Sequence, residues 1–157
     1  MEFKIKAPRP GELAERMCGM ANTRTGGTIL FGVEDRTGRL VGIEHPGDSI
    51  DNILRAARLL KPKLALLPPG PSTYKVGDVQ IIAVQVPPND GTLYQAGGVF
   101  WRRQGSHTIP MSSEEVEAHL NTYGSTHWET MLCPRAVLED IDFSLVERHL
   151  SYRAERS

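Results

Sequence analysis

The chain has 157 residues, of which 39% are hydrophobic and 24% charged, and its formal net charge at pH 7 is −1. This length and apolar content suffice for one hydrophobic core without disulfide staples. The balance of charge excludes a global basic field, although nucleic-acid binding needs only a local basic patch.

The two cysteines, Cys18 and Cys133, lie far apart and form neither a disulfide framework nor a metal-ligand spacing. No apolar stretch approaches the roughly 20 residues needed to cross a bilayer, and the N-terminus has no signal-like apolar segment. We therefore expect a cytoplasmic protein in a reducing compartment, with no membrane association.

Hydrophobic periodicity predicts hairpins and helices along the first 123 residues. Strands are indicated by alternation or by short apolar runs, and helices by apolar residues spaced by threes and fours. In chain order the patterns predict a strand at 2–6 with Phe3 and Ile5 on its inner face, a helix from Pro10 to Ala21, and a hairpin of strands 28–33 and 40–43. They next predict a helix capped by Asp48 or Ser49 that stops before Pro62, a hairpin of strands 72–76 and 79–86, and extended segments at 93–94 and 99–103. The last predicted helix is opened by a Ser112–Glu115 capping box and has an apolar stripe of Val116, Leu120 and Tyr123.

Because strands come in hairpins with helices between them, we expect an α+β fold in which helices pack on a mixed, largely antiparallel sheet. The strand at 79–86 is apolar on both faces and should be central. We expect residues 1–123 to form one domain. Residues 124–157 should form a connector and a C-terminal helix, because helical spacing resumes through Phe143 and Val146.

An acidic pair, Glu34 and Asp35, follows the apolar strand that ends at Val33. A strand end can hold carboxylates toward solvent, where they bind hard cations such as Mg²⁺ or Mn²⁺. The simpler interpretation is that both residues form a hairpin turn, where aspartate is favoured.

Several segments carry a resemblance to a known family. They are Ala21-Asn22-Thr23, Gly26-Gly27, residues 30–35, Gly38 and Val41-Gly42, together with Glu2-Phe3-Lys4, residues 82–87, Tyr94 and residues 100–108. In this order they resemble the signature of the Schlafen AlbA_2 domain over about residues 2–122. The resemblance implies a nucleic-acid-associated module, found in regulators, beside ATPase-like regions and as paired lobes in Schlafen ribonucleases.

In those ribonucleases a carboxylate triad holds the divalent metal that activates RNA cleavage. By resemblance, two of its members fall on Glu2 and Asp35, while the third precedes the first residue of this sequence. Glu34 is a substitute ligand only if the turn reorients it, since adjacent strand residues face opposite sides. The candidate metal ligands are therefore Glu2, Glu34 and Asp35, with Glu2 and Asp35 as candidate catalytic residues.

Basic residues near aromatic ones form a candidate nucleic-acid surface, because arginine pairs with phosphate and aromatic rings stack on bases. Its members are Lys4, Lys6, Arg102, Arg103 and His107. Alternation lets only one of the two arginines share a face with Trp101. The alternative interpretation is that Trp101 or Phe100 belongs to the core and both arginines are solvated edge charges.

The segment Asn22-Thr23 with Gly26-Gly27 has some features of a phosphate-binding loop. However, it follows a predicted helix instead of preceding one, and the sequence has no G-x-x-x-x-G-K-[ST] motif. We interpret it as a packing corner, in which Asn22 bonds the backbone and the glycines let helix and sheet approach closely.

Three functions are compatible with these features. The first is nucleic-acid binding, of DNA or RNA, as a regulator or as part of a larger machine, with no cofactor required. The second is a metal-dependent endoribonuclease that uses Mg²⁺ or Mn²⁺. The third is a non-catalytic assembly module associated with ATPase-like regions, in which the sheet edge or the final helix pairs with a partner; a homodimer of single lobes is one such pairing.

Overall fold

The computed structural model describes residues 1–123 and 142–154. The chain divides into two compact units, Met1–Ser125 and Thr126–Ser157. Within the second unit, the helix α4 (Phe143–Ala154) lies in the region where helical spacing resumes. The predicted connector at 124–141 lies outside the described residues.

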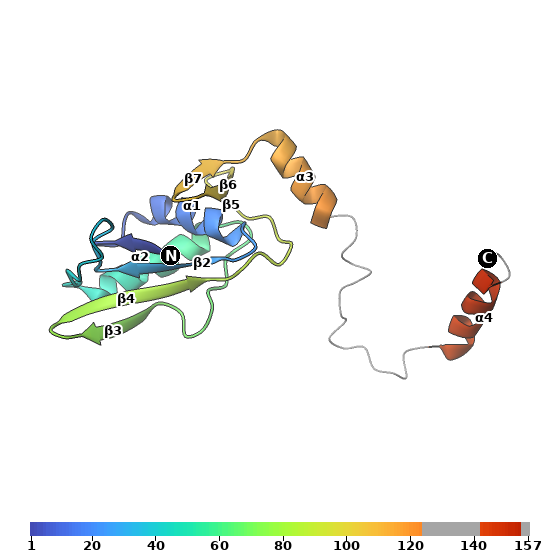
Figure 1. Cartoon of the computed structure of the whole chain (residues 1–157), viewed down its shortest axis with the longest axis horizontal. Coiled ribbons are helices and arrows are strands. Elements are labelled where there is room, and N and C mark those ends of the chain that lie inside the picture. The colour runs from blue at the N-terminus through green and yellow to red at the C-terminus, as the bar shows by residue number, and fades with distance from the viewer. Residues whose placement is uncertain (124–141, 155–157) are drawn as a thin grey trace. The chain divides into compact units, whose positions relative to one another are not determined.

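The first unit contains three helices and seven strands in its described residues (Figure 1). The helices are α1 (Pro10–Ala21), α2 (Pro46–Leu59) and α3 (Ser113–Tyr123). The strands are β1 (Glu2–Lys4), β2 (Gly27–Phe31), β3 (Ser72–Val76), β4 (Val79–Val86), β5 (Gln95–Ala96), β6 (Val99–Gln104) and β7 (His107–Pro110).

The strands form two sheets. One has the order β1-β2-β4-β3, in which β1 and β2 are parallel and the other pairs are antiparallel. The other has the order β5-β6-β7 and is antiparallel. These arrangements confirm the predicted α+β class with mixed, largely antiparallel sheets, and they confirm that β4 is central.

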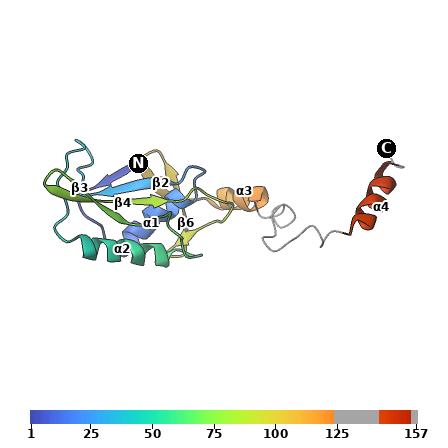
Figure 2. The same ribbon diagram turned by 90° about the horizontal axis from the view of Figure 1, so that it is seen from below.

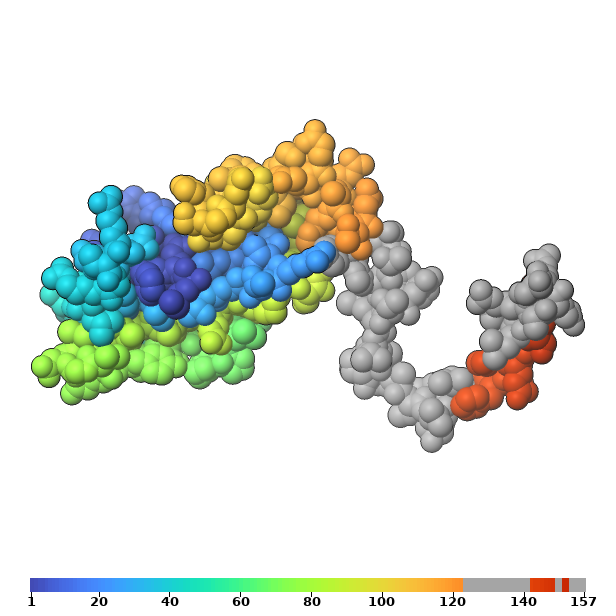
Figure 3. All heavy atoms as spheres, viewed as in Figure 1, coloured from blue at the N-terminus to red at the C-terminus, as the bar shows by residue number. Residues whose placement is uncertain are grey.

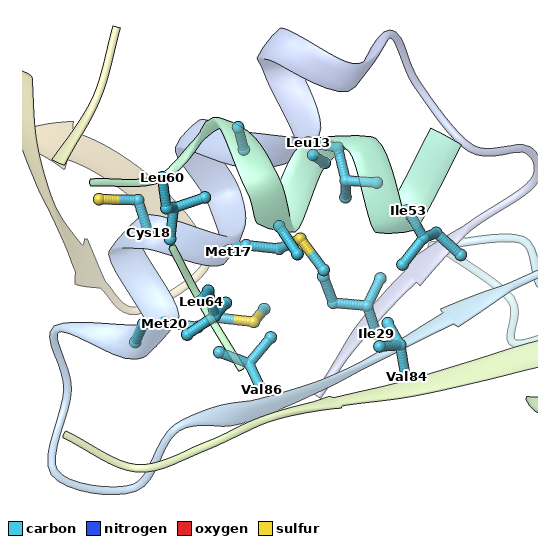
Figure 4. Packing of buried hydrophobic residues seen from close by; sticks show 14 of the residues in the cluster. Leu13, Met17, Cys18, Met20, Ile29, Ile53, Leu60, Leu64, Val84 and Val86 are labelled. Atoms are coloured by element: carbon cyan, nitrogen blue, oxygen red, sulfur yellow. The ribbon is translucent and has the colours of Figure 1, made fainter. Parts of the chain in front are cut away.

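The core lies between the four-stranded sheet and the helices α1 and α2, which cover one face of that sheet (Figures 2 and 4). Pro10 suits the first turn of α1, where its missing N–H is not needed. The predicted stripe Leu13, Met17 and Met20 is buried. Because α1 also packs against β5 and β6, this helix joins the two sheets.

Two predictions around β1 and β2 are wrong. Glu2 is the buried residue of β1, at 6% exposure, whereas Ile5 is 50% exposed. The predicted strand at 40–43 is reduced to one bridge between Val33 and Leu40. Gly32 has a positive φ, and its carbonyl oxygen accepts hydrogen bonds from the N–H groups of both residue 41 and residue 42. Because two residues of one strand oppose a single residue of the other, the ladder of backbone hydrogen bonds is interrupted.

Three further differences concern helix ends and exposed segments. The helix α2 begins at Pro46 with His45 as its N-cap, ahead of the predicted cap at Asp48 or Ser49, because proline is suited to the first helical position. Leu120 of the predicted α3 stripe is 53% exposed, so that stripe is not a core face. The strand β7 was not predicted; its His107 and Thr108 pair with Gln104 and Arg103.

No helix in the ranges 1–123 and 142–154 has the length and apolar character that a bilayer crossing requires.

Candidate functional site

A cavity of about 600 Å³ lies beside β1, and we call it the basic cavity. It is bounded by β1, by α1 and the corner that follows it, by the turn containing Asp35, and by β6 with the β6–β7 turn. Figure 3 shows this face of the first unit, where β1 (darkest blue) lies between the Asp35 turn (cyan) and the β6–β7 segment (yellow). Its titratable lining residues are Glu2, Lys4, Arg16, Asp35, Arg103 and His107.

Glu2 binds three cations at this cavity. Arg103 donates from Nη1 to Oε2 at 2.7 Å, and Arg16 donates from Nη1 to Oε1 at 3.0 Å. Lys4 Nζ lies 3.3 Å from Oε1. Glu2 pairs with Ile29 in the parallel register, so its side chain shares the face of the sheet that α1 covers. Both carboxylate oxygens are therefore engaged by basic side chains.

The basic cavity keeps an excess of positive charge. Three lysine or arginine side chains face two carboxylates, those of Glu2 and Asp35. This local excess stands against a net charge of −1 for the whole chain. The site therefore favours an anion locally, even though the chain as a whole does not.

The two carboxylates predicted from the acidic turn have different surroundings. Asp35 is exposed and lines the basic cavity together with Glu2. Glu34 accepts a hydrogen bond from the Thr37 hydroxyl and forms an ion pair with Arg39 at 3.6 Å. Glu34 lines the adjoining cavity of about 720 Å³ and not the basic cavity. The structure thus brings Glu2 and Asp35 to the basic cavity, whereas Glu34 lines only the adjoining cavity, which it shares with Asp35.

The predicted basic residues also separate. Lys4, Arg103 and His107 line the basic cavity; Lys4 also lines the adjoining cavity, where it is joined by Lys6. Arg102 lies on the other face of β6, where its Nε is 2.7 Å from Oε1 of Glu115 on α3. The pKa of Glu115 is lowered, first by the hydrogen bond from the Ser112 backbone N–H and also by Arg102. Arg102 therefore helps to hold α3 and does not contribute to the basic cavity.

Arg16 is a member of the site that sequence reasoning missed. It lies on α1, three residues after Leu13 and four before Met20, so it borders the buried stripe of that helix. A basic residue at the edge of a buried stripe is a weak signal, but it places the charge close to the sheet. Its partner Glu2 is 14 residues away in sequence.

The corner after α1 is built by Asn22 and two glycines. The Asn22 side-chain amide donates hydrogen bonds to the carbonyl oxygens of Tyr94 and Trp101, both at 2.8 Å, and its oxygen accepts one from the Tyr94 N–H at 2.8 Å. A Cβ on Gly27 would lie 2.7 Å from Met20 Sδ, and one on Gly26 would overlap the backbone at Val86 and Pro87. Thr23 completes the corner by donating its hydroxyl to the Met20 carbonyl oxygen. These contacts hold the end of α1 against both sheets and form one wall of the basic cavity.

Cys18 is buried in the same helix, and its Sγ donates to the Tyr94 carbonyl oxygen at 3.1 Å. Burial raises the pKa of its thiol from 9.0 to about 11, despite hydrogen bonds with the Trp101 backbone and the Asn22 side chain that favour the thiolate. Since the folded pKa exceeds the unfolded one, this contribution to stability is complete below pH 9 and is lost as pH rises toward 11.

We expect the free energy of unfolding of the wild type to fall by about 2 kcal/mol more than that of Cys18→Ala between about pH 8 and 10.5. Urea unfolding at both pH values measures this difference. Parallel pH profiles of the two proteins would contradict the expectation, because lysine and tyrosine titration is common to both.

The donor set of the basic cavity does not fit Mg²⁺ or Mn²⁺. These ions require several oxygen ligands free to coordinate, usually carboxylates supplemented by water. Here both oxygens of Glu2 are engaged by cations, and Asp35 is the other carboxylate that lines the cavity. Within the described part of the chain, no three His, Cys, Asp or Glu residues are grouped so that they could hold a metal ion.

A family model described as "Schlafen, AlbA_2" matches residues 1–112. The chain belongs to the Schlafen AlbA_2 family. The matched range includes β1, the acidic turn, the corner after α1 and the β6–β7 turn, which together line the basic cavity. The resemblance inferred from the sequence is therefore confirmed.

Two solved structures are similar to this chain, and the first of them shows the same fold. The DIP2311 protein from Corynebacterium diphtheriae matches with a TM-score of 0.57 and 21% identity, over 78% of the AlbA_2 chain and 24% of that protein. The AlbA_2 chain thus spans about a quarter of the length of this structural relative. The N-terminal domain of a protein from Nitrosomonas europaea, described as "Putative ATP-dependent DNA Helicase RecG-related Protein", matches with a TM-score of 0.48 and 25% identity, over 68% of this chain and 78% of that domain. No curated protein matches the AlbA_2 chain.

Proposed function

We propose that this AlbA_2 chain binds nucleic acid by placing backbone phosphates in the basic cavity. The observation that carries the proposal is the convergence of Lys4, Arg16 and Arg103 on one cavity of about 600 Å³. Arginine and lysine are the side chains that most often contact nucleic-acid phosphates, and arginine can do so with two parallel hydrogen bonds.

The cavity also offers neutral donors. Its lining residues include Thr25 and Ser106, which carry hydroxyl groups, and Gly105, which allows close approach of a ligand to the backbone. A phosphate contacts hydroxyl and N–H groups of this kind as well as cations. The proposal therefore needs no metal ion for binding. We further propose that the chain acts as a regulator or as one part of a larger machine.

The proposal predicts a moderate salt dependence. Three phosphate contacts give a slope of log K against log salt between about −2 and −3, the smaller magnitude for single strands. We expect this slope between about 50 and 200 mM salt in fluorescence anisotropy with labelled single-stranded RNA, single-stranded DNA and duplex DNA, all in EDTA.

The variant Lys4→Ala with Arg16→Ala should weaken binding and reduce the magnitude of the slope by about one to two. Its matched control is Arg55→Ala with Lys63→Ala, which removes two exposed basic residues that do not line the basic cavity. Equal binding by the two double variants, both shown to be folded by circular dichroism, would refute the proposal.

A further inference from the structure

Glu2 is the buried charged residue of the core region, at 6% exposure. Burying a carboxylate without partners is costly, and a carboxylate that keeps its charge in a buried place needs cations or hydrogen bonds. Glu2 has contacts with three cations, at 2.7, 3.0 and 3.3 Å. This arrangement is the opposite of a metal site, in which carboxylates gather and repel one another until the cation arrives.

The three cations come from separate elements. Lys4 lies on β1, Arg16 on α1 and Arg103 on β6. Basic side chains this close repel one another, and each is long and flexible. Contact with one carboxylate restricts all three to the wall of the basic cavity. Arg103 is further fixed because its Nη1 donates to the Thr108 hydroxyl at 3.1 Å.

We infer that Glu2 is the positioning residue of the basic cavity: it acts as the shared counter-ion that holds Lys4, Arg16 and Arg103 in place for a phosphate and does not ligate a divalent metal. The part of this inference that concerns phosphate rests on the proposed function. The part that concerns the counter-ion role does not, and the two parts are tested by separate measurements.

Thermal unfolding in EDTA tests the counter-ion role, because a counter-ion and a metal ligand predict opposite changes in Tm when Glu2 loses its charge. Glu2→Gln keeps the shape of the side chain and removes its charge, which leaves three cations without their partner. We expect it to lower the Tm by about 5 °C or more. A metal-ligating carboxylate would behave in the opposite way, because removing one of several mutually repelling carboxylates stabilises the metal-free protein. An unchanged or raised Tm for Glu2→Gln would overturn the inference.

A second measurement uses the wild type with MnCl₂ and therefore does not depend on the folding of Glu2→Gln. We expect the Tm of the wild type to be the same in EDTA and in Mn²⁺, and the Tm of Asp35→Asn likewise. Asp35 lines the same cavity and is exposed, so its variant is a suitable comparison. Stabilisation of the wild type by Mn²⁺ that Asp35→Asn abolishes would overturn the inference.

Binding of single-stranded RNA and DNA in EDTA tests the positioning role. Glu2→Gln and Asp35→Asn each remove one negative charge from the same cavity, so a purely electrostatic effect would tighten binding in both. We expect Asp35→Asn to tighten binding by about threefold and Glu2→Gln to weaken it by at least about threefold, a change of the size typical for one lost phosphate contact.

Tightening by Glu2→Gln equal to that by Asp35→Asn would refute the positioning role. If the wild type binds neither RNA nor DNA, the proposed function fails, and the two Tm comparisons still decide whether Glu2 is a counter-ion or a metal ligand.

Discussion

Replacing Asn22 with alanine is expected to destabilise the first unit by about 3–5 kcal/mol, because three backbone groups lose their hydrogen-bonding partner together. These groups are the carbonyl oxygens of Tyr94 and Trp101 and the N–H of Tyr94. Trp101 lies on β6 of the second sheet, and Tyr94 directly precedes β5. These residues are 79 and 72 positions away from Asn22 in sequence. Urea unfolding followed by tryptophan fluorescence measures the loss.

A matched control is Asn52→Ala on α2, which is also a half-buried asparagine. We expect its effect to stay within about 0.5 kcal/mol, because alanine is the better helix former. Asn22→Asp should be as damaging as Asn22→Ala, since it sets a carboxylate oxygen against the two carbonyl oxygens. A loss below about 1 kcal/mol for Asn22→Ala would show that the corner does not depend on this side chain.

Replacing Gly26 with alanine is expected to destabilise the same unit by about 3 kcal/mol or more, from two independent causes. Its φ of +62° is a left-handed conformation that a residue with a Cβ adopts at a cost. A Cβ at this position would also overlap the Val86 carbonyl oxygen and lie 2.6 Å from the Pro87 carbonyl carbon. Since the overlap is with backbone, the strand end itself would have to move.

Gly38→Ala separates the two causes. Gly38 has a φ of +68°, nearly the same as Gly26, but a Cβ there would have no atom within 4 Å. We expect Gly38→Ala to cost only about 1 kcal/mol, the conformational part alone. Equal losses for the two variants in urea unfolding would show that β4 yields easily to the added methyl group and that the close approach at Gly26 is unimportant.

Local patterns of apolar residues in the sequence predicted much of the fold. The stripe of Leu13, Met17 and Met20 predicted α1 correctly because helical periodicity is a property of neighbouring residues, and the two-sided apolar character of 79–86 correctly predicted a central strand. The burial of Glu2 was not predictable in this way. Alternation suggested that Phe3 and Ile5 face inward, but two of the three cations that compensate Glu2 lie on α1 and on β6, the latter 101 residues away.

The candidate site was predictable to the extent that it depends on single strands. Alternation along β6 indicated that Arg102 and Arg103 face opposite sides, and the structure gives them different partners, Glu115 and Glu2. Arg16 was missed because its part in the site comes from how α1 packs on the sheet, which no local pattern records. Lys6 was predicted to join Lys4 in the basic surface, yet β1 ends at Lys4; Lys4 lines both cavities, whereas Lys6 lines the adjoining one and not the basic cavity.

The wide separation of the three cations along the chain couples occupancy of the basic cavity to folding. In the unfolded chain Lys4, Arg16 and Arg103 are dispersed, so an anion that requires all three binds only the folded form. By mass action, a ligand present at about 100 times its Kd then adds about 2.7 kcal/mol to the free energy of unfolding. Under the proposed function, we therefore expect the chain to resist proteolysis better when nucleic acid saturates the cavity than when nucleic acid is absent.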